Sequence, residues 1–262
     1  MIKQKISGLT DLFRKNSFLF SELVKRDFKK KYKRTYLGML WSVLSPLLTL
    51  LVMSIVFKQF FGRTVEHYTI YLFCGNIVFS FFNDATSGGM SSLMANASIF
   101  TKVNVPKYLF LFSRNISSLI NFGLTLAVFF VFCIFDGITF TFGFLLLIVP
   151  ILCLIVFNLG MGLILSALYV FFRDMQYLWS VFTMLLMYMS AIFYTTDGFG
   201  EYEKLFLLNP VFVYIKYFRT IVIDNALPSI ECNLLAVGYA VIAFAIGAII
   251  YKKFNHKFLY YV

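Results

Sequence analysis

The chain has 262 residues, of which 60% are hydrophobic and only 13% are charged. A soluble domain has roughly 45–50% apolar and 25% charged residues, and a soluble globule of this length has too small an interior to bury the excess apolar surface. This composition excludes a soluble globular protein and indicates a membrane protein. The net charge of +11 does not indicate nucleic-acid binding, because the basic residues flank apolar runs instead of forming a patch on a polar surface.

Six stretches are candidates for transmembrane helices. A helix needs about 20 mostly apolar residues to cross the ~30 Å hydrocarbon layer of a bilayer. The stretch 67–95 is interrupted by Asp84 and continues with small polar residues, so we expect one long helix whose second half faces protein or water. The sequence predicts an all-α membrane protein with six transmembrane helices in a single domain, residues 35–262. The five uncharged stretches are 35–57, 115–135, 142–172, 175–196 and 232–251.

The placement of basic residues predicts that both ends of the chain are cytoplasmic. Loops rich in Lys and Arg stay on the cytoplasmic side. With the N-terminus inside and six spans, eighteen of the 23 Lys and Arg residues, Arg114 among them, are cytoplasmic. Five spans would place the basic segment 252–257 outside, so six is the better number. The five basic residues on the outer side are Lys58, Arg63, Lys204, Lys216 and Arg219.

Residues 1–34 form a basic, amphipathic cytoplasmic region. Leu9, Leu12, Phe13 and Phe20 recur at helical spacing, with charged residues between them. This pattern is typical of an interfacial helix on the inner leaflet, and a soluble cytoplasmic helix is the alternative. Charge interrupts the region throughout, so we expect no cleavable signal peptide.

The segment between the fifth and sixth spans, residues 197–231, is too long for a turn and too apolar for a solvated loop. Two apolar runs, 205–208 and 211–215, are separated by Asn209 and Pro210. We expect two short helices that re-enter the outer leaflet and are broken at the proline.

The sequence contains no pattern typical of a catalytic, metal or nucleotide site. Its two histidines, His67 and His256, fall on opposite sides of the membrane in this topology. None of the 15 glycines precedes a lysine, as a phosphate-binding loop requires. The four cysteines lie in or beside apolar stretches, without the spacing of a metal site. We predict that the chain is not an enzyme, has no cofactor of its own and takes energy for transport from a partner or a gradient.

Asp84 is the one acidic residue at membrane depth. Its polar neighbours in the sequence, Asn83, Thr86 and Ser87, are uncharged, whereas an ion or proton site needs a charged partner. We expect Asp84 to face a hydrated pore or a helix interface, and an ion or proton site is the alternative.

A long motif near the N-terminus resembles the permeases of ABC type-2 exporters. It runs from Leu23 to Trp41 as LVKRDFKKKYKRTYLGMLW and is followed by Pro46. Its spacing is similar to that of the polysaccharide and polyol-phosphate subgroup, which exports O-antigen, capsule or teichoic acid. Ser190 departs from the pattern, because many relatives have a proline after this serine. Further matching positions are Gly75, Leu93, Asn96, Ile99, Lys102, Pro106, Phe172-Arg173-Asp174 and Asn209-Pro210.

The resemblance implies a permease that pairs with a second copy of itself and with two ATP-binding cassette subunits, which hold the ATP and magnesium. It also implies that residues 96–106 form a coupling helix seated in a groove of the ATPase. A short amphipathic connection suits such docking, and an ordinary cytoplasmic turn is the alternative. The predicted coupling residues are Asn96, Ile99, Phe100, Lys102, Val103 and Pro106, with Ile99, Phe100 and Val103 as the anchors.

The basic residues before the first span have two compatible interpretations. They fix the topology and bind anionic lipid head groups, at about 1 kcal/mol each near the surface. By resemblance, they also lie at the gate where substrate enters and meet the pyrophosphate of a lipid-linked glycan. These residues are Lys25, Arg26, Lys29, Lys30, Lys31, Lys33 and Arg34.

Aromatic residues make up 20% of the chain, and saccharides can slide along aromatic faces. We expect some of them to line the export path, although Phe also faces lipid and Tyr belongs to interfacial belts. The candidate pore residues are Tyr68, Tyr71, Phe79, Phe81, Phe82, Asp84, Tyr188, Phe193 and Tyr194.

The favoured function is ATP-driven export of a lipid-linked polysaccharide across the cytoplasmic (inner) membrane of a bacterium by a multi-pass permease. Two alternatives stay open. One is an exporter of the same type that carries a drug or lipid, and the other is a gradient-driven carrier or membrane enzyme. The second alternative needs paired charges inside the membrane, and Asp84 is the only candidate in the predicted spans.

Overall fold

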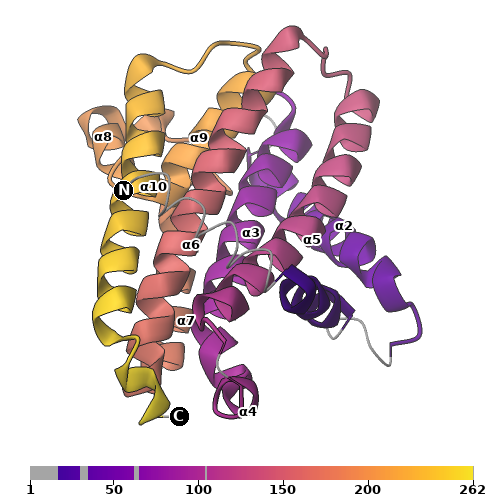
Figure 1. Cartoon of the computed structure of the whole chain (residues 1–262). Coiled ribbons are helices and arrows are strands. Elements are labelled where there is room, and N and C mark those ends of the chain that lie inside the picture. The colour runs from indigo at the N-terminus through magenta and orange to yellow at the C-terminus, as the bar shows by residue number, and fades with distance from the viewer. Residues whose placement is uncertain (1–16, 30–34, 62–64, 104, 262) are drawn as a thin grey trace.

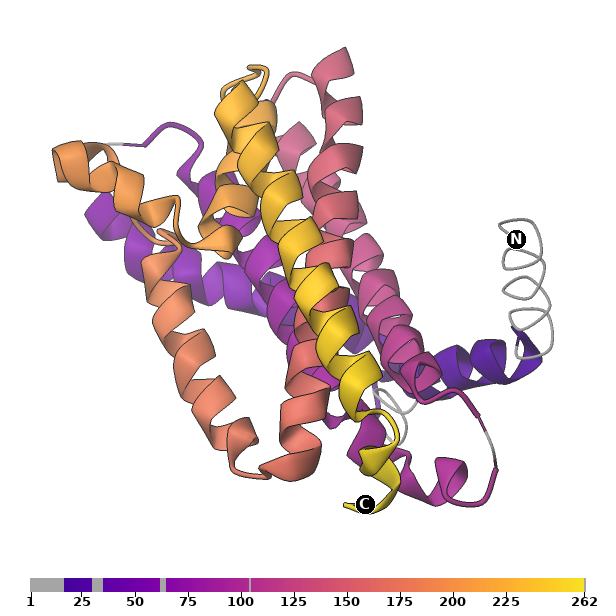
Figure 2. The ribbon, with the colours of Figure 1, turned by 60° about the vertical axis from the view of Figure 1, so that its left-hand side comes forward.

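A computed structural model describes residues 17–29, 35–61, 65–103 and 105–261, and every element in this part of the chain is helical. Long helices run side by side in a bundle, with α2 and α7 leaning away from it (Figures 1 and 2). The long helices are α2 (Trp41–Phe61), α3 (Tyr68–Ala95), α5 (Tyr108–Phe135), α6 (Ile148–Phe171), α7 (Met175–Met189) and α10 (Ile230–Phe254). The short ones are η1 (Gly38–Leu40), α4 (Ala97–Phe100), η2 (Phe142–Leu147), η3 (Asp197–Tyr202), α8 (Glu203–Phe206), α9 (Pro210–Val222) and η4 (Lys257–Leu259).

Within the described residues, four helical segments are long and apolar enough to cross a membrane. They correspond to the predicted first, third, fourth and sixth spans. The third begins at Tyr108 and not at residue 115, because the helix takes in Arg114, whose charge was read from the sequence as the edge of the span. The four segments are Trp41–Gln59, Tyr108–Phe135, Phe142–Phe171 and Ile230–Phe254.

The other two predicted spans have irregular features. Helix α3 is one continuous helix of 28 residues, as expected for 67–95, and its second half carries the polar residues that follow Asp84. Helix α7 has only 15 residues, about 22 Å at 1.5 Å per residue, and ends well before residue 196. Ala191 stops it, because this residue has a left-handed φ of 47° that cannot continue a helix.

Helices α6 and α10 pack against each other through glycines. A Cβ on Gly160 of α6 would collide with the backbone of Ala243 and Phe244 on α10, and one on Gly247 of α10 would meet the carbonyl of Gly160. The two backbones approach this closely only because both positions lack a side chain. Gly160 and Gly247 therefore permit this crossing, whereas a Cβ on Gly238 would meet nothing within 4 Å.

In residues 197–231, the short helices α8 and α9 lie on either side of the break that was predicted at Asn209-Pro210. The side chain of Asn209 accepts a hydrogen bond from the Val211 amide at 3.0 Å, and Pro210 is the first residue of α9. An Asn cap followed by proline at the first helical position is a favourable start for a helix. This segment lies at the end of the bundle opposite α4 and the C-terminus (Figure 2).

Residues 17–29 form a helix that lies across the bundle, toward the end that carries α4 and the C-terminus (Figure 2). Leu23 is buried there in a cluster with Leu93 and Phe110. Most of the predicted interfacial helix, including Leu9, Leu12 and Phe13, lies outside the described residues.

Candidate functional site

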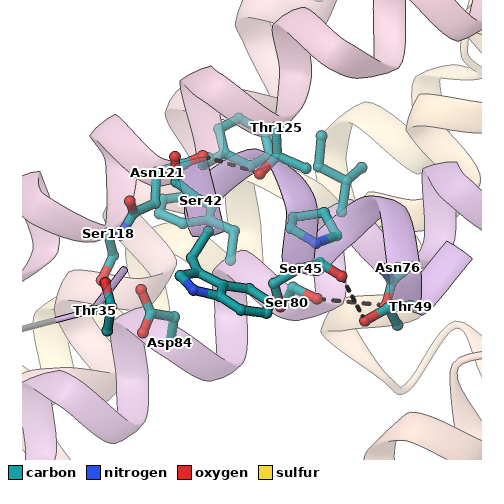
Figure 3. A pocket seen from close by; sticks show the side chains of 15 residues that line it. Thr35, Ser42, Ser45, Thr49, Asn76, Ser80, Asp84, Ser118, Asn121 and Thr125 are labelled. Atoms are coloured by element: carbon teal, nitrogen blue, oxygen red, sulfur yellow. Dashed lines mark hydrogen bonds between the residues drawn. The ribbon is translucent and has the colours of Figure 1, made fainter. Parts of the chain in front are cut away.

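A groove of about 390 Å³ opens between α2, α3 and α5 (Figure 3). Each of the three helices lines it with polar residues three or four positions apart, which places them on one face of the helix. Thr35, Asp84 and Ser118 lie at one end, and Thr49 and Asn76 lie at the other (Figure 3). The polar lining is Thr35, Ser42, Ser45, Thr49, Asn76, Ser80, Asp84, Ser118, Asn121 and Thr125; the apolar lining is Trp41, Pro46, Ile77, Phe81 and Phe122.

Most of these positions were missed by the sequence reasoning, which considered aromatic residues and Asp84 alone. A usable signal was present, because Ser, Thr and Asn recur at helical spacing on one face of three apolar spans. Polar residues in a membrane helix are costly when they face lipid, so such a stripe indicates a shared interior surface.

Several polar groups in the groove bond within their own helix. The Thr49 hydroxyl donates to the Ser45 carbonyl at 2.9 Å, and the Thr125 hydroxyl donates to the Asn121 carbonyl at 3.0 Å. Ser118 differs, because its hydroxyl is buried, with 2% of the residue exposed, and has no hydrogen-bond partner in the described part of the chain. In the empty groove, several of the hydroxyl and amide groups therefore have partners within their own helices. The same groups can bond to a polar ligand when one is present.

Asp84 forms an ion pair with Arg114 of α5 across 3.3 Å, and both side chains are about a quarter exposed. The guanidinium lies over Gly88, where any Cβ would collide with it. The sequence reasoning placed Arg114 in a cytoplasmic loop and gave Asp84 no charged neighbour. The structure corrects both expectations, because α5 begins at Tyr108 and so carries Arg114 within the helix, beside Asp84 of α3.

The Arg-Asp motif of the N-terminal helix is attached to the same region. Asp27 is buried and accepts hydrogen bonds from Arg26 at 2.7 Å and from the Ser113 hydroxyl at 3.2 Å. Ser113 precedes Arg114 in α5, so the motif ties the N-terminal helix to the helix that carries the ion pair. Among the predicted gate residues, Lys25 and Lys29 are exposed. Lys30, Lys31, Lys33 and Arg34 lie outside the described residues.

Several predicted pore aromatics are buried inside the chain and do not face the groove. The Tyr68 hydroxyl donates to the Phe193 carbonyl at 2.7 Å, and Phe79 and Phe82 belong to the main apolar core. This burial follows from the central position of α3, which has α5, α6 and α9 packed around it. Of the predicted set, only Asp84 and Phe81 line the groove. Tyr188 is exposed and Tyr194 is half-buried. The role of these aromatics in a path stays a prediction.

Charge counting assigned Arg219 to the outer side of the membrane and said nothing of its burial; in the structure it is buried, with 8% exposed. Its guanidinium donates to the carbonyls of Ala191 at 2.9 Å, Ile192 at 3.1 Å and Tyr71 at 3.2 Å. The surrounding apolar run, with Phe218 beside it, was the available signal that the helix face around Arg219 is covered. The residue joins α9 to α3 and to the turn after α7.

The predicted coupling segment contains α4 and is held to the rest of the chain. Phe100 is 6% exposed and packs on Phe110, with ring centroids 6.0 Å apart. It therefore points into the chain, whereas we expected it to be an anchor for the ATPase. Lys107 donates to the Asn255 carbonyl at 2.6 Å, and its burial lowers the pKa of the ammonium group. Asn96 is buried, and Ile99 and Pro106 are half-buried. Lys102 and Val103 are exposed, so they remain available to a partner.

Comparison with known proteins decides the family. The profile of the ABC-2 type transporter family matches residues 19–223, which is most of the chain. The chain belongs to this family. The matched residues of this ABC-2 transporter include the Arg-Asp motif, all three helices of the groove, α4, α8 and α9.

Relatives of this ABC-2 transporter are similar over nearly their whole length. The O-antigen export system permease protein of Klebsiella pneumoniae is 28% identical, over 92% of this chain and 95% of the relative. The protein of the same description from Myxococcus xanthus is 26% identical, over 95% and 96%. The capsule polysaccharide export inner-membrane protein of Neisseria meningitidis serogroup A is 25% identical, over 87% and 95%.

Proposed function

We propose that this ABC-2 transporter is the permease subunit of an ATP-driven exporter that moves a polysaccharide across the inner membrane of a bacterium. The observation that carries the proposal is the similarity, over almost the full length, to permeases for O-antigen and capsule. The groove supports it, because a row of hydroxyl, amide and carboxylate groups within apolar helices suits a hydroxyl-rich polymer. A purely apolar drug would gain little from such a lining and would leave the polar groups of the groove without partners.

We propose six transmembrane segments with both termini in the cytoplasm. Helix α3 has 28 residues, about 42 Å, which is long enough to cross, and the groove hides part of its polar face from lipid. Helix α7 exposes Leu178, Val181 and Leu185, which suits contact with acyl chains. The segment that follows α7 would complete the crossing, and the short helices η3, α8 and α9 would sit in the outer leaflet.

The energy for export would come from ATP hydrolysis in partner subunits, which bind ATP and magnesium. The chain itself has no Gly-Lys pair for a phosphate-binding loop. The segment of residues 96–106 would meet the ATPase through Lys102 and Val103, the exposed members of the predicted coupling set. Helix α4, the C-terminus and the loop between α6 and α7 share one end of the bundle, which would face the ATPase (Figure 2).

Two copies of the chain would form the exporter with two ATP-binding subunits. Helices α2 and α7 lean out of the bundle and expose long apolar faces, on which a second copy or lipid would pack (Figure 2). The substrate would be lipid-linked, with basic residues of the N-terminal helix at the gate where its head group enters.

The test is reconstitution of the chain with its proposed ATP-binding subunit, in vesicles loaded with polyprenyl-linked glycan. We expect a stable complex, ATP hydrolysis that rises with the glycan, and glycan that becomes accessible on the far side of the membrane. If ATP hydrolysis responds to apolar drugs and ignores the glycan, the substrate class is wrong. If no complex forms with the ATPase, the proposal fails as a whole.

A gradient-driven carrier is the second candidate, because the Asp84–Arg114 pair is the kind of charge pair that such a carrier requires. The two functions are separated by an ionophore in the same vesicles. Collapse of the proton gradient would stop a carrier, whereas export that needs only ATP would continue.

A further inference from the structure

We infer that the groove between α2, α3 and α5 binds an uncharged, hydroxyl-rich segment of the exported polymer, with Asp84 as a principal hydrogen-bond acceptor. The inference rests on the proposed export function and adds the charge class of the substrate and the residues that select it. Among polymers of similar size, the groove would favour a neutral glycan over one built from phosphodiesters.

The lining has the chemistry that a sugar residue requires. Trp41, Phe81 and Phe122 supply ring faces, against which the C–H face of a pyranose can pack. Ser, Thr and Asn side chains supply donors and acceptors for the ring hydroxyls. The volume of about 390 Å³ lies within the ~300–1,000 Å³ of typical ligand pockets. The groove therefore suits a short stretch of glycan.

Ser118 gives independent evidence that the groove takes a polar ligand. Its hydroxyl is buried, lies at the Asp84 end of the groove and has no partner in the part of the chain that the structure describes (Figure 3). A buried hydroxyl without a partner costs stability. A ligand hydroxyl at this end could bond to Ser118 and to the carboxylate of Asp84 together.

The charge of the lining points to a neutral segment. Asp84 is the one charged residue among the described lining residues, and Arg114 lies over Gly88, outside that lining. The groove thus presents a carboxylate, which accepts hydrogen bonds from hydroxyl groups through about four acceptor positions. A phosphodiester at the same place would bring a negative charge for which the described lining holds no cation, since Arg114 is already paired with Asp84. Arg114 is a positioning residue, since its ion pair holds the carboxylate at the end of the groove.

The natural tryptophans allow a direct binding measurement. The chain has two, of which Trp41 lines the groove and Trp179 is buried on α7. A Trp179→Phe variant of the full chain in nanodiscs would leave Trp41 as the only tryptophan. Its emission would be recorded during titration with neutral hexasaccharides of mannose, galactose and N-acetylglucosamine, and with a hexamer of glycerol phosphate.

We expect at least one neutral hexasaccharide to change the emission of Trp41 in a saturable way, and the glycerol phosphate hexamer to bind at least about tenfold more weakly. In the same background, Asp84→Asn should weaken the binding of that hexasaccharide about tenfold, the size expected for one charge-assisted hydrogen bond. Asp174→Asn is the matched control, because it removes an exposed carboxylate outside the groove and should change nothing. Arg114→Gln should weaken binding, and Arg114→Lys should restore most of it.

Melting temperatures of all variants would show whether they fold. If Asp84→Asn does not fold, the same binding measurement is made with Asp84→Glu, which displaces the carboxylate and should also weaken binding. Equal or tighter binding of the glycerol phosphate hexamer, unchanged binding in Asp84→Asn, or no response to any hexasaccharide would overturn the inference. In that case glycan export by the reconstituted complex would show that the proposed function still stands. Failure of the wild-type complex to export any glycan would instead refute the proposed function.

Discussion

Arg219 of α9 lies directly over the ring of Tyr71 on α3, with 3.4 Å between the guanidinium carbon and the ring centroid. The same guanidinium donates to the carbonyls of Ala191 and Ile192, in the turn that ends α7. A cation–π contact and carbonyl acceptors together compensate for the burial of the charge. This one side chain therefore connects α9 to α3 and to the turn after α7.

Replacement of Arg219 should destabilise the chain strongly. Arg219→Met removes the donor of three carbonyls, two of them buried, and we expect a loss of about 3 kcal/mol or more, seen as a lower melting temperature in detergent. Lys216→Met on the same helix is the control. Its ion pair with Glu203 is about two-fifths exposed, so its loss should cost less than about 1 kcal/mol. Equal effects of the two changes would show that Arg219 does not connect the helices.

The crossing of α6 and α10 should tolerate no side chain at Gly160. Gly160→Ala would push a methyl group into the backbone of Ala243, and we expect a loss of about 1–3 kcal/mol, as for other overpacked sites. Gly238→Ala on α10 has open space around it and should leave the melting temperature unchanged or raise it. A stable Gly160→Ala variant would contradict the close approach of the two helices.

Substitutions at two residues of the coupling segment should affect different properties, one the binding of the ATPase and the other the stability of the chain. Val103 is 54% exposed, so Val103→Asp should leave the melting temperature of the chain unchanged and weaken its co-purification with the ATP-binding subunit. Phe100 packs on Phe110 inside the chain, so Phe100→Ala should lower the melting temperature by itself, at a cost of about 3–5 kcal/mol. If Val103→Asp binds the ATPase normally, this end of the chain docks elsewhere.

Cysteine labelling can test the proposed topology. Three of the four natural cysteines are buried and Cys153 is half-buried, so the background reaction with an impermeant maleimide should be low. Leu227→Cys, in the exposed loop before α10, should react from outside intact cells. Asp174→Cys, in the loop between α6 and α7, should react only after the membrane is permeabilised. The reverse pattern, or reaction of both from one side, would refute the proposed orientation.

Local features of the structure followed from local features of the sequence. The break at Asn209-Pro210 was predictable because proline cannot continue a helix, and Asn favours the cap. The continuity of α3 through Asp84 was predictable because backbone at membrane depth must satisfy its own hydrogen bonds. The early end of α7 was not predicted, because nothing in the apolar run up to residue 196 shows that Ala191 adopts a left-handed conformation.

The residues of the site were predicted only in part, and one reason explains each residue whose position was not predicted. Asp84 was recognised as unusual, but its partner was counted as a loop residue, and Arg219 was assigned to the outer side of the membrane without any expectation that it is buried. Charge counting assigns residues to sides of a membrane and says nothing about which residues face each other. The aromatic residues were proposed for the path because of their chemistry, whereas burial between helices depends on how α3 packs.

The sequence by itself determined that this is a helical membrane protein, where its apolar stretches lie and that the chain breaks at Asn209-Pro210. These properties follow from solvent preference and backbone restriction, which act within a few residues of each position. Only the tertiary structure decided that Asp84 meets Arg114, 30 residues away, and that polar stripes on three helices form one groove. Such contacts depend on the rotation and crossing of whole helices, which no single stretch of sequence specifies.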